Sequence, residues 1–250
     1  MKKRAGARGK ARWKAEKRWA AALAGLLALA VLTALMLTLP GFTEALYRLL
    51  GITQVKVPVV GTSDVPVAVH VIDVGQGDAV LLEDHGAFAL VDAGPPEAAD
   101  VVVEYLRLVG VQALDYVVMT HPHADHIGGM QKVSERFEVK KVLLPNFDLA
   151  PYPTTSTFVD LLALWLEDEV PAETAKAGQV WPLGQGSLSV VHAGLETDEE
   201  HNRLSLGVLF EGGGLRFLNT GDAEKPNERA MLEAGADVAA DVFLAAHHGS

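Results

Sequence analysis

The feature that most constrains this chain is a cluster of three histidines and one aspartate within residues 121–126, directly after a short apolar run. His121 and His123 are two positions apart, so in extended backbone their side chains point the same way. Asp125 and His126 follow at once. Imidazole and carboxylate groups are ligands of Zn, Mn and Fe. The cluster therefore predicts a metal site at the end of a strand.

Four other apolar runs also end in a short polar segment. These segments are Asp73–Asp78, Asp92–Gly94, Asn219–Asp222 and His247–Ser250. A single strand that ends in Asp and Gly is usually followed by a simple turn. Five such strand ends in one chain predict instead that these strands share one rim of the fold.

The spacing of apolar residues predicts that clusters of strands alternate with helices. Helical spacing is clear in Glu97–Val109, and Gly110 is a plausible stop. This organisation favours a layered α/β sandwich over an all-β fold. The predicted strands around the polar segments are Val67–Val74, Ala79–Leu82, Phe88–Val91, Leu114–Met119, Leu204–Phe210, Leu215–Leu218 and Val242–Ala245, and the other predicted helices are Gly128–Arg136, Ser156–Glu169 and Pro226–Glu233.

The beginning of the chain differs in charge from the rest. Residues 1–19 hold nine Lys or Arg and one acid, whereas the remainder holds 12 basic and 31 acidic residues. Residues 20–39 carry no charge, and twenty helical residues span about 30 Å, the thickness of a bilayer core. We expect a basic cytoplasmic leader and one transmembrane helix, which by the positive-inside rule places the rest outside the cell. A cleaved signal peptide and a soluble helix are the alternatives.

Residues 40–66 are expected to link this anchor to a globular domain at 67–250.

The chain contains no cysteine. Disulfides, thiolate catalysis and sulfur ligands are therefore excluded, and any metal must be held by nitrogen and oxygen. Two metal ions about 3.5 to 4 Å apart can share one water molecule, and metal binding lowers the pKa of water from about 15.7 to about 7.

Residues 121–126 resemble the HxHxDH signature of the metallo-β-lactamase superfamily. With Asp73–Ala79, Thr220–Asp222 and His247–Ser250, in that order, they resemble the hydrolase domain of competence proteins of the ComEC/Rec2 type. The resemblance extends from about Val67 to the last residue. It implies an αββα sandwich, with the site on the rim between two sheets and two divalent ions, Zn or Mn.

The resemblance also implies a role for each matching residue. His121 and His123 would hold the first metal, Asp222 would bridge both, and the second metal would be held by Asp125, His126 and His247. Asp125 would also orient the nucleophilic water.

Other matching residues are expected near the metals rather than on them. Asp92 would brace the histidine loop. His248 would contact substrate, donate a proton to the leaving group or support its neighbour. In the segment that begins at Asp73, Gln76 and Asp78 are expected either to contact substrate or to form a turn.

One departure from the superfamily concerns the first metal. Members usually supply one more histidine between the HxHxDH segment and the bridging aspartate, whereas residues 201–206 here read His-Asn-Arg-Leu-Ser-Leu. The first site is therefore expected to be poor in ligands. His201 is a candidate replacement or an exposed loop residue, and Asn202 and Ser205 are expected to line the site.

The leading functional hypothesis is a metal-dependent phosphodiesterase or nuclease that uses metal-bound hydroxide. Single-stranded DNA is one possible substrate, but the acidity of the domain disfavours a grip on DNA, which depends on Lys and Arg. A small or cell-wall phosphodiester is the alternative substrate, and an inactive, membrane-anchored binding module is the alternative class. The sequence indicates no particular protein partner. We also expect the sandwich to continue beyond Ser250, with structure that covers its second sheet.

Overall fold

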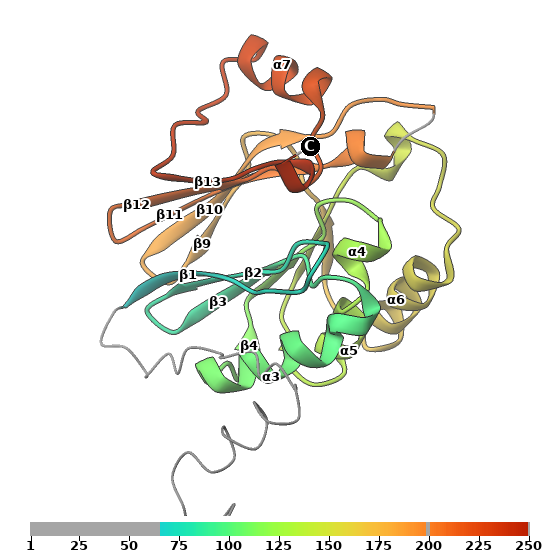
Figure 1. Cartoon of the computed structure of the whole chain (residues 1–250), viewed down its shortest axis with the longest axis vertical. Helices are drawn as coiled ribbons and strands as arrows, with labels where there is room; N and C mark the ends of the chain where they lie inside the picture. The colour runs from blue at the N-terminus through green and yellow to red at the C-terminus, as the bar shows by residue number, and fades with distance from the viewer. Residues whose placement is uncertain (1–65, 199–200, 250) are drawn as a thin grey trace, which may run out of the picture. The chain divides into compact units, whose positions relative to one another are not determined.

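The computed structural model describes residues 66–198 and 201–249, so the predicted leader and anchor and nearly all of the linker lie outside the described residues. Two sheets face each other, with helices on their outer sides (Figure 1). This is the αββα arrangement that the sequence predicts. Among the helices of the described segments, none is long and apolar enough to cross a membrane.

The first sheet is built from the first half of the domain, in the order β1-β2-β3-β5-β7-β8. Neighbours from β1 to β3 are antiparallel, and those from β3 onward are parallel. Its strands are β1 Val67–Val71, β2 Val80–Asp84, β3 Ala87–Val91, β5 Tyr116–Val118, β7 Val142–Leu144 and β8 Ala172–Thr174.

The second sheet has the order β13-β12-β11-β10-β9. All its pairs are antiparallel except β12 and β13, which run parallel and are joined through a helix. Its strands are β9 Val180–Leu183, β10 Gly186–Ala193, β11 Leu206–Gly212, β12 Leu215–Asn219 and β13 Val242–Leu244. A separate pair is formed by β4 Ala113–Leu114 and β6 Glu138–Val139.

Two predicted elements are divided in the structure. The predicted strand Leu114–Met119 is split at Asp115, whose carboxylate accepts the Phe88 backbone N–H at 2.9 Å. The predicted helix Gly128–Arg136 begins earlier, as α4 Ala124–Ile127, and continues as α5 Met130–Ser134.

The inner strands of the first sheet are buried on both faces because successive side chains alternate between two apolar layers. Val80 and Leu82 on β2 pack in the layer between the sheets. Leu81 packs in the outer layer with Leu106 and Phe158, all fully buried. The helices of that outer layer are α3 Ala99–Val109, α5 and α6 Ser156–Glu167.

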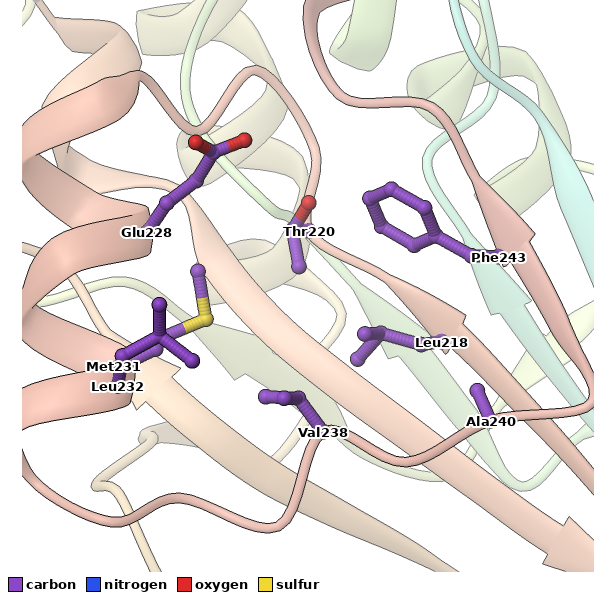
Figure 2. A pocket seen from close by; sticks show the side chains of 8 residues that line it. All are labelled: Leu218, Thr220, Glu228, Met231, Leu232, Val238, Ala240 and Phe243. Carbon is purple, nitrogen blue, oxygen red and sulfur yellow. The ribbon is translucent and has the colours of Figure 1, made fainter.

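The outer face of the second sheet is covered by α7 Lys225–Glu233 (Figure 1). The amide nitrogen of Asn227 on this helix lies 3.0 Å from Nε2 of His192 on β10. Beside the helix is a hollow of about 350 Å³ (Figure 2), and Leu232 and Phe243 at this hollow are 69% and 53% exposed. Apolar surface therefore remains open on this side.

Candidate metal centre

The polar segments that follow several strands meet at one rim of the sandwich. β3 leads into Asp92, β5 into the histidine cluster, and β12 into Asp222. β13 leads into the short 3₁₀ turn His247–Gly249. These residues therefore lie at one rim of the fold, as the sequence predicts.

Asp92 lies beneath the histidine loop and is fully buried. Its Oδ1 accepts the Thr120 backbone N–H at 2.9 Å, and its Oδ2 accepts the Thr120 hydroxyl at 2.6 Å. The same Oδ2 lies 2.8 Å from Nδ1 of His126. An outer carboxylate of this kind fixes the tautomer and orientation of a metal-binding imidazole. Asp92 thus directs Nε2 of His126 toward the rim.

A first group of donors consists of His121, His123 and Asp222, with one donor atom from each within 4.8 Å of the others. His121 is fully buried and Asp222 is 3% exposed. Nε2 of His121 lies 3.7 Å from Oδ2 of Asp222. Three donors at this separation can hold one divalent ion.

A second group consists of Asp125, His126 and His248, again with donor atoms within 4.8 Å of one another. Oδ1 of Asp222 lies 3.1 Å from Nε2 of His126 and 3.6 Å from Nε2 of His248. One oxygen of Asp222 therefore faces each group. The carboxylate is placed to bridge two ions.

The two terminal histidines lie beside different oxygens of Asp222. His248 lies in the second group, with its Nε2 at 3.5 Å from Oδ2 of Asp125. His247 lies 3.9 Å from Oδ2 of Asp222, the oxygen that faces the first group. The assignment of His247 to the second metal stays a prediction, and so do the roles expected for His248.

The buried polar atoms of the centre fit a cation. Nε2 of His121, Nε2 of His126 and Oδ1 of Asp222 are all buried; the last two face each other at 3.1 Å, whereas Nε2 of His121 makes no hydrogen bond. Buried polar groups in proteins are nearly always satisfied. A bound metal ion would give the buried Nε2 of His121 a partner. The residues present therefore fit the two divalent ions that the sequence predicts.

Protonation of the histidines depends on their surroundings. Burial, together with the neighbouring histidines, holds the pKa of His121 well below its usual range, so its ring is neutral and free to bind metal. Burial also opposes charge on His126, but Asp92 and Asp222 outweigh it and raise the pKa of His126 to about 11. A metal ion at Nε2 of His126 must displace that proton, because ligation requires the neutral imidazole.

The loop that carries Asp78 packs directly against the metal-binding segment. Burial and the charge of Asp92 raise the pKa of Asp78 to about 6, and its Oδ1 is 3.8 Å from Nδ1 of His248. A Cβ atom on Gly77 would lie 2.1 Å from the Asp125 carbonyl oxygen, so only glycine allows this approach. Asp73 accepts the Gly75 N–H at 3.2 Å in an exposed turn, and Gln76 is exposed.

The segment between the predicted ligands supplies two residues to the site. Ser205 is fully buried and its hydroxyl accepts the Asp222 backbone N–H at 3.1 Å, which positions the bridging residue. Asn202 is buried, and its amide nitrogen lies 3.4 Å from Nε2 of His247. Nε2 of His201 lies 2.8 Å from the Pro151 carbonyl oxygen.

Two contributors to the site were not singled out from the sequence. Thr120 anchors Asp92 and is fully buried, and its hydroxyl lies 3.1 Å from Nδ1 of His121. Gly77 permits the close approach of the Asp78 loop. The available signal for Thr120 was its position directly before the histidine cluster. Gly77 lies within the segment Asp73–Ala79, but its close packing against Asp125 depends on the tertiary structure.

Fold and site together define an αββα protein with His and Asp groups at its rim that could hold metal ions. The profile of the metallo-beta-lactamase superfamily matches residues 72–250. This chain belongs to the metallo-beta-lactamase superfamily.

Among characterised sequences, the chain is similar to two proteins named for competence. It is 26% identical over 200 residues to ComE operon protein 3 of Bacillus subtilis (strain 168), covering 73% of this chain and 25% of that protein. It is 29% identical over 237 residues to competence protein ComA of Neisseria gonorrhoeae, covering 92% of this chain and 31% of that protein. The predicted resemblance is confirmed, and the chain spans about a third or less of these relatives.

A solved structure of the metallo-beta-lactamase SMB-1 in a complex with mercaptoacetic acid is also similar. Its identity is 18%, its TM-score is 0.49, and the match covers 72% of this chain and 76% of that one.

Proposed function

We propose that this protein is a metal-dependent hydrolase that cleaves phosphodiester bonds. The observation that carries the proposal is the pair of donor groups that share Asp222, one on each of its oxygens. Two divalent ions bound there would activate water and neutralise negative charge on a phosphate group. Superfamily membership supports a metal-dependent hydrolase, and a phosphodiester such as DNA is the substrate that the resemblance to competence proteins implies.

The chain's own residues supply orientation and proton transfer. Asp125 extends from the start of α4 as a member of the second donor group, where it can accept a hydrogen bond from an attacking water. His248 lies between Asp78 and Asp125, within 3.8 and 3.5 Å. It is 24% exposed at its side chain, so it can reach both the site and a bound substrate. His248 is therefore the residue placed to give a proton to a leaving oxygen.

A small phosphodiester remains the second candidate substrate. After residue 19 the chain holds 12 basic and 31 acidic residues. Affinity for DNA comes mainly from neutralisation of phosphates by Lys and Arg. An acidic domain therefore favours a substrate of one or two nucleotides, or a single cell-wall phosphodiester, over a long strand.

We also propose that residues 20–39 anchor the chain in the membrane once, with the hydrolase domain on the outer side. The support is the uncharged apolar run and the nine basic residues that precede it. Alkaline extraction of membranes from cells that make the full chain tests the anchor. Recovery of the uncleaved chain in the soluble fraction would contradict it.

The catalytic proposal is tested with the full chain in detergent, loaded with Mn²⁺ or Zn²⁺ and assayed on bis-p-nitrophenyl phosphate and single-stranded DNA. We expect turnover by the wild type and a loss of at least about 100-fold in kcat for Asp222→Ala and Asp125→Ala, the size of effect seen when one stabilising group is removed. Asp160→Ala, an exposed change on α6, is the matched control and is expected to be fully active.

The possible outcomes separate the hypotheses. Cleavage of the small ester without cleavage of DNA supports the small-substrate alternative. A folded wild type that binds two ions and cleaves neither substrate overturns the enzyme and supports a binding module. An Asp125→Ala variant with full activity contradicts the role given to that residue.

A further inference from the structure

We propose that the side-chain oxygen of Asn202 is a ligand of the first metal ion, beside His121, His123 and Asp222. The proposal rests on the metal-dependent function proposed above, but it concerns metal binding and does not depend on which bond is cleaved. It assigns a ligand at the place where the superfamily usually has a histidine and this chain has none.

The first argument is that the oxygen of Asn202 lacks a partner. The residue is only 7% exposed, and its Oδ1 makes no hydrogen bond. A buried amide oxygen left unpaired is costly. It is an acceptor, so a cation or an N–H or O–H group must face it when the site is filled. The same deficiency affects Nε2 of His121, which belongs to the first donor group.

The second argument is position. The amide nitrogen of Asn202 lies 3.4 Å from Nε2 of His247, which in turn lies 3.9 Å from Oδ2 of Asp222. This is the oxygen that lies 3.7 Å from Nε2 of His121. The amide is therefore linked through His247 to the oxygen of Asp222 that faces the first donor group.

The third argument is that the backbone around Asn202 is held in place. The Asn202 carbonyl accepts the Ser205 N–H at 3.0 Å. The next carbonyl, that of Arg203, accepts the Leu195 N–H at 2.7 Å and the Asn227 amide at 2.9 Å. A side chain on such a fixed turn is oriented before any ligand arrives, as ligands of precise sites need to be.

His201 is the rival for the same role, and its contacts point elsewhere. Its Nε2 lies 2.8 Å from the Pro151 carbonyl oxygen, so that nitrogen serves as a hydrogen-bond donor rather than as a ligand. Its ring centroid is 6.0 Å from that of His123. His201 packs at the outer edge of the site and ties it to the loop at Pro151.

The proposed ligand changes the preference of the site. With Asn202 the first ion has two imidazole nitrogens and two oxygens, one of them on a neutral amide. Oxygen ligands suit Mn²⁺ relative to Zn²⁺ better than imidazole does. The first ion should therefore bind more weakly than the second and discriminate less in favour of Zn²⁺.

The test is metal titration of the full chain in detergent after removal of metal with EDTA, followed by calorimetry and by elemental analysis with Zn²⁺ or Mn²⁺. We expect two sites in the wild type. Asn202→Leu, which keeps the volume and loses the oxygen, should weaken one site by about 10- to 100-fold and leave the other unchanged. Asn202→Asp should retain both sites. Asn202→His should raise the Zn²⁺ over Mn²⁺ preference of the weaker site, and His201→Gln should match the wild type.

Three results would overturn the proposal. They are unchanged binding by Asn202→Leu, loss of the weaker ion in His201→Gln, and a single site in the folded wild type. If Asn202→Leu does not fold, the comparison of Asn202→His with the wild type decides, and an unchanged Zn²⁺ over Mn²⁺ preference overturns the proposal. A wild type that binds two ions with this pattern and cleaves nothing would refute the proposed reaction while leaving the Asn202 assignment standing.

Discussion

The two sheets carry unequal outer layers. On the first sheet, α3, α5 and α6 close over a continuous apolar core in which Leu106 and Phe158 are fully buried. On the second sheet, α7 contributes Met231 and a polar contact to His192, and a hollow of about 350 Å³ stays open beside it (Figure 2). The difference shows that burial in the first layer stabilises the fold, while the second layer depends on few contacts.

The largest expected effect is on the closed layer. Phe158→Ala should lower the free energy of unfolding by about 3 to 5 kcal/mol, because it removes a fully buried ring and leaves a cavity. Urea unfolding of the metal-free chain, followed by circular dichroism, measures it. If the free energy of unfolding falls by less than about 1 kcal/mol, the first layer can collapse around the cavity. The two outer layers would then not differ in how much they stabilise the fold.

A smaller effect is expected from the polar contact of the second layer. Burial lowers the pKa of His192, and its neutral Nε2 faces the amide nitrogen of Asn227 at 3.0 Å. Because the folded-state pKa lies below the unfolded value of about 6.5, this stabilisation is full above that pH and is lost as pH falls through the folded-state value.

The measurement is urea unfolding at pH values from about 5 to about 8. His192→Gln, which cannot titrate, should lose less stability on acidification than the wild type does. If the free energy of unfolding changes equally with pH in the two proteins, the contact of His192 with Asn227 does not link α7 to β10.

The smallest effect is expected at the open hollow. Phe243 on β13 is 53% exposed, and surface changes away from special features usually alter stability by about 0.5 kcal/mol or less. Phe243→Ala should therefore be nearly neutral in the same unfolding assay. A loss of about 2 kcal/mol or more would show that this face is covered in solution.

The sequence predicted the rim of the molecule better than its periphery. The histidine cluster at residues 121–126 is short and local, so residue type and spacing predicted a metal site there, whereas the role of Asp222 came from the resemblance to the metallo-β-lactamase superfamily. β9 was missed because Pro182 interrupts its pattern, and the strand tolerates proline because it lies at an edge of the sheet.

The order of the two terminal histidines could not be predicted from the sequence. His247 and His248 both adopt positive φ values, 50° and 54°. This backbone departs from the alternation of an extended strand, so sequence spacing does not fix which ring turns toward Asp125. The orphaned oxygen of Asn202 is equally a product of tertiary packing, since it depends on contacts between η3 (His201–Leu204) and the end of β13.

Asp222 follows β12 in the second sheet, whereas His121 and His126 follow β5 in the first. The donor set therefore does not exist until the two halves of the domain have docked. During synthesis the first sheet can form while the bridging carboxylate has still to be made. A ligand that binds only the docked state stabilises it by mass action. Metal supply would then govern how many new chains reach the mature form, as well as how fast those chains work.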